Sequence, residues 1–325
     1  MARVTRGLPR GRRGQTTAAG IPRREAPRRG GEGREASQSD GSGTTLRRMV
    51  QDTIPGAPPE WPGYAVPTAR LRMFVRHEPR PEKPTLVLLH GLAVHGGMYE
   101  GGVRRELSEA FNLVVPDLRG HGLSEAPGGA WEIEDFADDV AALLDAMAIE
   151  RAHVVGYSMG GFVAQSLVQR HPDRVDRLGL LCTAPRQARP TMRAGLAALQ
   201  ALFRVVPPRA MLPISRRILS GPGMPPQMAY VLPWLLQHNT RRGISGSARA
   251  LRRADLRGGL AAVRHPTLLV TAEHDTALPR VAWQPLLDSL CDIRHEHFDD
   301  AGHGLAASHG ARLGALLRTF LEDTP

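Results

Sequence analysis

Short apolar runs alternate with amphipathic stretches between residues 64 and 325. Continuous apolar runs are typical of strands buried on both faces of a parallel sheet, and apolar positions recurring every three or four residues are typical of covering helices. The pattern predicts strands at 69–75, 85–89, 113–115, 152–155, 178–182, 267–271 and 293–298, and helices near 97–110, 133–147, 159–171, 281–290 and 306–321. We therefore expect an α/β fold with a mostly parallel central sheet and helices on both faces.

Residues 186–254 interrupt this alternation. Two basic amphipathic stretches, 191–206 and 210–219, lie among proline and glycine clusters that end helices. The pattern predicts a helical cap, inserted at about 186–254 into an α/β domain that spans residues 61–325.

Residues 1–60 are rich in Arg, Gly and Pro and have almost no apolar periodicity. A segment of this composition has too little apolar surface to bury a core, so we expect it to be disordered. Two interpretations of residues 1–48 stay open. Many arginines with few acidic residues are typical of an organellar transit peptide. Alternatively, translation starts at Met49, and residues 1–48 correspond to sequence upstream of the true start.

The net charge of +10 is unevenly distributed. Residues 1–48 contain twelve arginines and four acidic residues, whereas residues 49–325 have a net charge of only +2. A basic whole-chain charge therefore does not indicate nucleic-acid binding by the folded domain, and no zinc-finger, helix-turn-helix or RNA-binding signature is present.

The predicted cap is basic and the rest of the domain is acidic. Residues 186–254 contain twelve arginines and no Asp or Glu, which leaves the remainder of residues 49–325 at −10. Three interpretations stay open: docking of the cap on the acidic body, preference for an anionic substrate, or weak contact with anionic lipid.

Several classes of protein are disfavoured by the sequence. No apolar run is long enough to span a bilayer and no secretory signal is present, so we expect a cytoplasmic protein. Cys182 and Cys291 lie in apolar surroundings and are predicted to be buried free thiols. We expect no metal and no cofactor, because metal-ligand spacing, a phosphate loop and a dinucleotide fingerprint are all missing. The oligomeric state stays open.

Residues 154–161 read Val-Val-Gly-Tyr-Ser-Met-Gly-Gly and predict a strand, a sharp turn and a helix. The spacing Gly156-x-Ser158-x-Gly160 is that of a nucleophile elbow, in which small residues let strand and helix pass closely while the serine projects above the sheet. Glycine-rich turns of this kind are also common as purely structural features. The catalytic interpretation therefore depends on partners for Ser158.

A serine nucleophile needs a histidine base, and that histidine needs a carboxylate to orient it. Reacting groups of such folds gather at the carboxyl ends of the strands. Asp275 follows the strand at 267–271, with Glu273 as the less favoured alternative, and His303 follows the strand at 293–298. His295 and His297 alternate within a strand and are expected to be structural.

The oxyanion formed on attack needs two fixed N–H donors. We expect them from the backbone of Met159, directly after the nucleophile, and of Leu92, in the loop after the strand at 85–89. His90 in that loop is expected to brace it. For the substrate pocket we select Tyr157, Phe203 and Trp234, although Tyr157 suits a packing role as well.

From about residue 64 to 325 the chain resembles the α/β-hydrolase superfamily, in the branch of capped esterases, lactonases, cofactor-free haloperoxidases and carbon–carbon bond hydrolases. The resemblance rests on residues 89–91 (Leu-His-Gly), 117–124 (Asp-Leu-Arg-Gly-His-Gly-Leu-Ser), 156–161, Asp275 and Gly302-His303, which occur in order. It implies a triad of Ser158, His303 and Asp275, an oxyanion hole at Leu92 and Met159, and a lid near 186–254.

The resulting expectation is a serine hydrolase that cleaves a carboxylic ester, lactone or thioester through an acyl-enzyme on Ser158. Its partner would be a small acyl substrate with an apolar body or an acidic group. Two alternatives stay open: a carbon–carbon bond hydrolase with the same triad, and a ligand-binding protein that uses the fold without catalysis.

Overall fold

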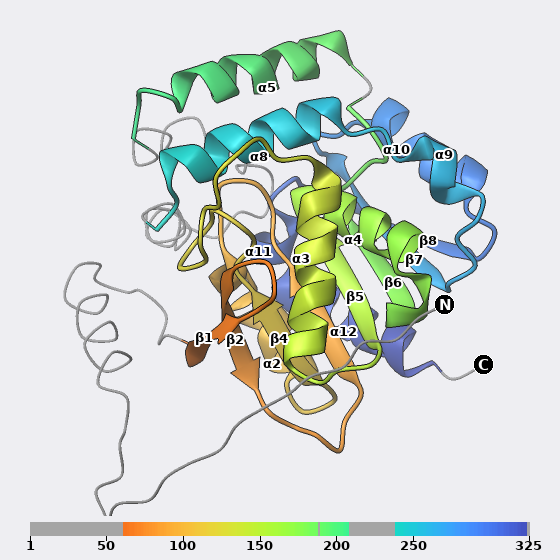
Figure 1. Cartoon of the computed structure of the whole chain (residues 1–325). Coiled ribbons are helices and arrows are strands. Elements are labelled where there is room, and N and C mark those ends of the chain that lie inside the picture. The colour runs from red at the N-terminus through yellow and green to blue at the C-terminus, as the bar shows by residue number, and fades with distance from the viewer. Residues whose placement is uncertain (1–60, 188, 208–237, 324–325) are drawn as a thin grey trace, which may run out of the picture. The chain divides into compact units, whose positions relative to one another are not determined.

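The computed structural model describes residues 61–187, 189–207 and 238–323 (Figure 1). The expected disorder of residues 1–60, the expected helix at 210–219 and the pocket residue Trp234 lie outside the described residues.

Within these residues eight strands form one sheet in the order β1-β2-β4-β3-β5-β6-β7-β8. β1 pairs with β2 and β2 with β4 in antiparallel fashion, and every other pair is parallel. The sheet is therefore mostly parallel, as expected. The strands are β1 Gly63–Pro67, β2 Arg72–Glu78, β3 Thr85–Leu89, β4 Asn112–Pro116, β5 Ala152–Tyr157, β6 Val175–Leu181, β7 Thr267–His274 and β8 Ile293–Gly302.

Helices occupy the connections between the strands from β3 onward (Figure 1). The described helices are η1 Gly96–Tyr99, α2 Gly102–Leu107, α3 Ile133–Ala146, α4 Met159–Arg170, η2 Pro172–Arg174, α5 Pro190–Leu202, α8 Arg241–Arg253, α9 Arg257–Leu260, α10 Arg280–Ser289, α11 Leu305–Ser308 and α12 Gly310–Glu322. None of them is long and apolar enough to cross a membrane.

Two apolar cores lie on opposite faces of the sheet. Val87 and Leu89 of β3 pack with α3, α4 and α10, whereas Leu86 and Leu88 pack with α2 and α12. Because successive strand residues point to opposite faces, a continuous apolar run supplies both cores at once. This explains why the central strands were readable from the sequence.

Element boundaries differ from the predictions where packing overrides the local pattern. β1 was not predicted, and it pairs only with β2 at the sheet edge. The helix predicted at 306–321 is divided at His309 into α11 and α12. A Cβ atom at Gly102 of α2 would lie 2.5 Å from the backbone nitrogen of Ala311, so α12 begins where it rests directly on α2.

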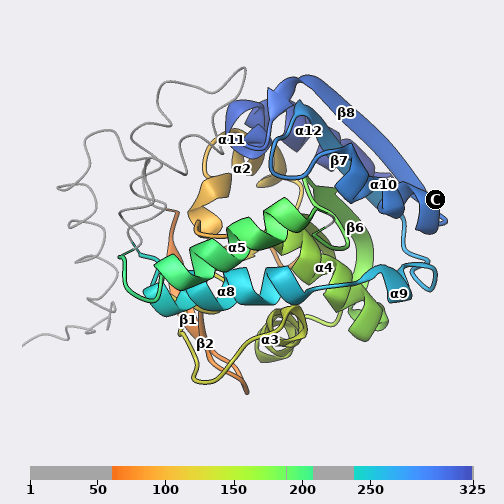
Figure 2. The same ribbon diagram turned by 90° about the horizontal axis from the view of Figure 1, so that it is seen from above.

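The described part of the predicted cap consists of α5 and α8, which lie side by side (Figure 2). α8 buries Ile244, Ala248 and Leu251, whereas no residue of α5 is fully buried. Arg249 and Arg253 of α8 pair with Glu132, which precedes α3. Part of the basic charge of this region is thus balanced by the acidic body, as the docking interpretation predicts.

Candidate active site

Ser158 lies at the turn between β5 and α4. Its backbone has φ 52° and ψ −112°, a strained conformation for a residue with a side chain. A Cβ atom at Gly156 would lie 2.2 Å from the carbonyl oxygen of Gly160, and one at Gly160 would lie 2.2 Å from that of Leu89. Only glycine fits at both positions, so the packing of β3, β5 and α4 explains the spacing of the elbow.

Ser158, His303 and Asp275 form one hydrogen-bonded chain. Asp275 directly follows β7 and His303 directly follows β8, at the same edge of the sheet as Ser158. The Oδ2 atom of Asp275 lies 2.8 Å from Nδ1 of His303, and Nε2 of His303 lies 3.1 Å from Oγ of Ser158. Asp275 and His303 are each 6% exposed, so their contact is shielded from solvent, whereas Ser158 is partly exposed.

The second carboxylate oxygen of Asp275 is also occupied. Oδ1 accepts hydrogen bonds from the backbone N–H groups of Ala277 at 2.9 Å and Leu278 at 2.8 Å. These bonds hold the carboxylate so that Oδ2 accepts the Nδ1 proton of His303. The other ring nitrogen, Nε2, is then an acceptor directed at the hydroxyl of Ser158.

The other acidic and histidine candidates lie apart from this chain. Glu273 is exposed and contacts Nε2 of His297 at 3.1 Å. His295 and His297 both bond the hydroxyl of Thr271, at 2.8 Å each. Glu273 therefore does not reach His303, and the two strand histidines have structural partners.

Leu92 and Met159 adjoin Ser158 from two sides. Met159 is the first residue of α4, and Leu92 follows Gly91, at which a Cβ atom would lie 3.5 Å from Cβ of Ser158. Within the described part of the chain, no hydrogen-bond partner is seen for the backbone N–H of either residue. Both groups remain available as donors beside the serine.

Tyr157 is buried, and its phenol donates a hydrogen bond to the backbone carbonyl of His303. Burial raises the pKa of this phenol well above its usual value, so it stays a neutral donor. These contacts fit the packing role, and they tie the loop of His303 to the elbow. Sequence reasoning did not find this link, because it joins residues 146 positions apart.

Phe203 is fully buried and packs with Leu92, Ala93 and Ile244. It also lines a cavity of about 540 Å³ between α5, α8 and residues 129–131. The polar residues that line this cavity are Gln200, Arg204, Arg241, Arg242, Ser245 and Arg249. An aromatic side chain thus separates the loop of Leu92 from a basic cavity.

A second buried polar cluster lies at the ends of β2, β3 and β4. Asp117 accepts hydrogen bonds from Arg76 at 2.6 Å and from the N–H of Gly96 at 2.8 Å. Burial opposes the charge of Asp117, but Arg76, two neighbouring histidines and the N–H of Leu123 together outweigh this effect, and the pKa is lowered to about 2. His90 accepts the N–H of Leu118 at 2.9 Å and so braces the loop, as expected.

The prediction that both cysteines are buried is wrong for Cys291. Cys182 is buried and Cys291 is exposed, and both are free thiols. Cys291 lies in the turn before β8, where its flanking residues Leu290 and Ile293 face inward while its own side chain does not. Apolar neighbours in sequence did not determine burial at a turn.

The comparisons with known proteins agree with this fold. Residues 84–210 match the family model of the alpha/beta hydrolase fold. The chain is 31% identical to a pimeloyl-(acyl-carrier protein) methyl ester esterase of Chromobacterium violaceum, over 78% of this chain and 99% of that protein. It is 29% identical to a 2-hydroxymuconate semialdehyde hydrolase of Pseudomonas sp. strain CF600, over 68% of this chain and 80% of that protein.

The crystal structure of a hydrolase from Pseudomonas aeruginosa is also similar, with 26% identity, a TM-score of 0.72, and coverage of 80% of this chain and 98% of that one. Fold, site and relatives thus define one class of protein, the enzymes with the α/β-hydrolase fold. The chain belongs to the α/β-hydrolase superfamily and is a hydrolase.

Proposed function

We propose that this hydrolase cleaves a carboxylic ester through an acyl-enzyme on Ser158, with His303 as base and Asp275 as the residue that orients it. The observation that carries the proposal is the chain from Asp275 through His303 to Ser158, with contacts of 2.8 and 3.1 Å. A thioester or lactone presents the same carbonyl chemistry and falls within the proposal.

In the proposed reaction Oγ of Ser158 attacks the carbonyl carbon while Nε2 of His303 takes the hydroxyl proton. The carbonyl oxygen becomes an oxyanion, which the N–H groups of Leu92 and Met159 stabilise. Collapse expels the alcohol, which receives the proton from His303. Water then attacks the acyl-enzyme, gives its proton to the same nitrogen, and the acid leaves as Ser158 is restored.

We further propose that the cap at about 186–254 binds the acyl part of the substrate. Phe203 packs on the loop of Leu92 and would line the apolar part of the pocket, with Trp234 as the other lining residue. The arginines of the cavity beside Phe203 would attract an anionic substrate to the cap. The relative named as a methyl ester esterase supports an ester of a small alcohol.

Carbon–carbon bond hydrolysis is the second candidate, because a similar relative is named as a 2-hydroxymuconate semialdehyde hydrolase. The same triad would serve it. A panel of p-nitrophenyl esters, a lactone and a vinylogous diketone acid separates the two candidates by which substrate is turned over fastest. A folded protein that turns over none of them would leave a hydrolase with a narrower substrate range or a binding protein.

The decisive experiment compares wild type, Ser158→Ala and Ser166→Ala in p-nitrophenyl ester hydrolysis. Ser166 is a buried serine of α4, the helix that Ser158 precedes, and lies outside the hydrogen-bonded chain, so its variant serves as a control. We expect the Ser158 variant to lose turnover by about a thousandfold or more and the control to keep it. A fluorophosphonate should add to wild type and the control only, as seen by intact mass. Equal turnover in all three proteins would refute the proposal.

A further inference from the structure

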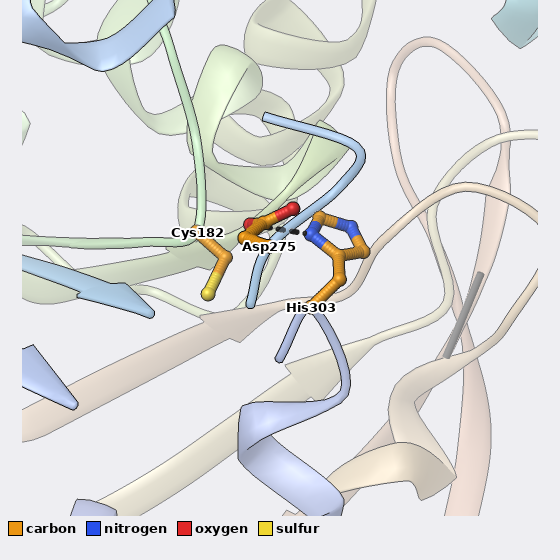
Figure 3. A group of neighbouring side chains, drawn as sticks. All are labelled: Cys182, Asp275 and His303. Carbon is orange, nitrogen blue, oxygen red and sulfur yellow. Dashed lines mark hydrogen bonds and ion pairs between the residues drawn. The ribbon is translucent and has the colours of Figure 1, made fainter. Parts of the chain in front are cut away.

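A buried thiol lies beside the proposed acid and base. Cys182 follows β6, and its Sγ atom, a carboxylate oxygen of Asp275 and a ring nitrogen of His303 all lie within 4.8 Å of one another (Figure 3). The proposed mechanism uses the last two residues and leaves the thiol without a role. Cys182 is 1% exposed and has φ 44°, a conformation that is uncommon for a residue with a side chain.

The thiol cannot serve as a nucleophile in this position. Burial and the neighbouring charge of Asp275 hold the pKa of the Cys182 thiol well above its usual range. The neutral thiol is a poor nucleophile and a poor target for oxidation. A cation placed between sulfur and carboxylate would stabilise the thiolate here.

We propose that Cys182, Asp275 and His303 form a binding site for a thiophilic divalent cation such as Zn²⁺ or Cd²⁺, which switches the hydrolase off. Thiolate, imidazole and carboxylate are the ligands that zinc takes in proteins, whereas Mg²⁺ and Ca²⁺ prefer oxygen alone. The switch rests on the proposed function, but binding of the cation does not.

The geometry requires only a small adjustment. With the usual zinc–ligand lengths, the ligand atoms of a tetrahedral site lie about 3.4 to 3.6 Å apart. Asp275 and His303 contact each other at 2.8 Å and would move apart by about 0.6 Å, and the 4.8 Å limit leaves roughly 1 Å to close by rotation of the Cys182 side chain. Figure 3 shows the carboxylate of Asp275 between the sulfur and the imidazole, where it would bridge to the cation.

The proton balance explains why the bound cation would stop catalysis. Cys182 loses its proton to solvent and its sulfur binds the cation. Nδ1 of His303, which faces Asp275, becomes the nitrogen ligand, so the ring proton moves to Nε2. Nε2 then no longer accepts the proton of Ser158. One proton is released for each cation bound, so binding strengthens as the pH rises.

The test titrates Cd²⁺ into wild type, Cys291→Ser and Cys182→Ser, and follows ester hydrolysis together with the ultraviolet absorption of the Cd²⁺–thiolate bond. Cys291→Ser removes the exposed thiol and is the matched control. In wild type and the control we expect the thiolate band, and a loss of hydrolysis of about a hundredfold or more that EDTA reverses, as for removal of a general base. Mg²⁺ should have no effect.

Cys182→Ser should show neither the band nor the inhibition, measured against its own rate without cation. If the band or the inhibition persists in folded Cys182→Ser, or if the folded Cys291→Ser protein shows no band, the site is refuted. Ser158→Ala separates this outcome from failure of the proposed function. It should show the band although it has no turnover, because the band reports the cation site without the reaction.

Discussion

Two regions at the carboxyl ends of the strands use the same residue types in different ways. His90, beside Asp117, donates from Nδ1 to the carbonyl of Gly91 at 2.8 Å and accepts a backbone N–H at Nε2. His303, beside Asp275, directs Nε2 at the hydroxyl of Ser158. We call the first the bracing region and the second the triad region.

The two histidines differ in both of their partners. Both ring nitrogens of His90 bond backbone groups, and a backbone N–H does not give up its proton, so His90 stabilises its loop without further chemistry. His303 bonds the carboxylate of Asp275 and a serine hydroxyl that can transfer a proton to Nε2, so this pair becomes a candidate base and its orienting acid. Histidine and aspartate at strand ends are therefore not sufficient to define a site.

The largest effect expected in this comparison is on catalysis in the triad region. Asp275→Asn places an amide donor against Nδ1 of His303 and favours the tautomer that cannot accept the serine proton. We expect a loss of about 10⁴-fold in kcat/KM for p-nitrophenyl esters, with little change in the free energy of unfolding. Asp299→Asn, at an exposed residue, is the control. A loss below about tenfold would place the orienting acid elsewhere.

The bracing region should respond in stability instead. Asp117→Asn leaves the guanidinium of Arg76, 8% exposed, without its charged partner. We expect the free energy of unfolding to fall by about 3 to 5 kcal/mol, as for other broken buried ion pairs. Urea unfolding measures this loss, with Asp300→Asn as the exposed control. If the Asp117→Asn protein is stable but has lost turnover, Asp117 contributes to catalysis and the distinction between the two regions fails.

The pH dependence of stability should also come from the bracing region. Burial lowers the pKa of His90 to about 4 and that of His121 to about 3. The unfolded chain then binds more protons, so stability is full above pH 6.5 and falls as the pH drops toward 4. For His90 alone we expect a loss of roughly 3 kcal/mol. His90→Gln should reduce the loss of stability between pH 6.5 and 4 by roughly 3 kcal/mol in urea unfolding, with the part due to His121 remaining, whereas His297→Gln should not reduce it.

A smaller effect is expected at Tyr157, which joins the loop of His303 to the elbow of Ser158. Tyr157→Phe removes the phenol that donates to the carbonyl of His303. One lost buried hydrogen bond corresponds to about 1 kcal/mol, so we expect roughly fivefold lower kcat and a similar loss of stability. Tyr64→Phe, at an exposed phenol, serves as the control. Unchanged kcat would mean that Tyr157 does not position His303.

The smallest effect should come from the basic cavity of the cap. Arg204→Glu together with Arg241→Glu reverses charge at two exposed lining residues. Charges of this exposure contribute about 1 kcal/mol or less, so we expect up to about fivefold higher KM for an anionic ester and little change for a neutral one. Arg294→Glu on β8 is the control. Equal changes of KM for the anionic and the neutral ester would show that the cavity does not favour an anionic substrate.

The sequence alone determined the type of fold and the three residues of the hydrogen-bonded chain. Buried parallel strands are continuous apolar runs, and the elbow at Ser158 needs glycines at fixed positions, so both are local patterns. Asp275 and His303 could be chosen because the chain order places each directly after a strand. The same local reasoning failed for Cys291, whose burial depends on the direction of a turn.

Only the tertiary structure decided what each of these residues faces. The contact of Tyr157 with the loop of His303, the charge pair of Arg76 with Asp117 and the cluster around Cys182 join segments that are far apart in the chain. No periodicity encodes such contacts, because they arise when strands that are distant in sequence become neighbours in the sheet. The sequence therefore identified the groups that we propose to react, and the packing of the sheet determined their partners.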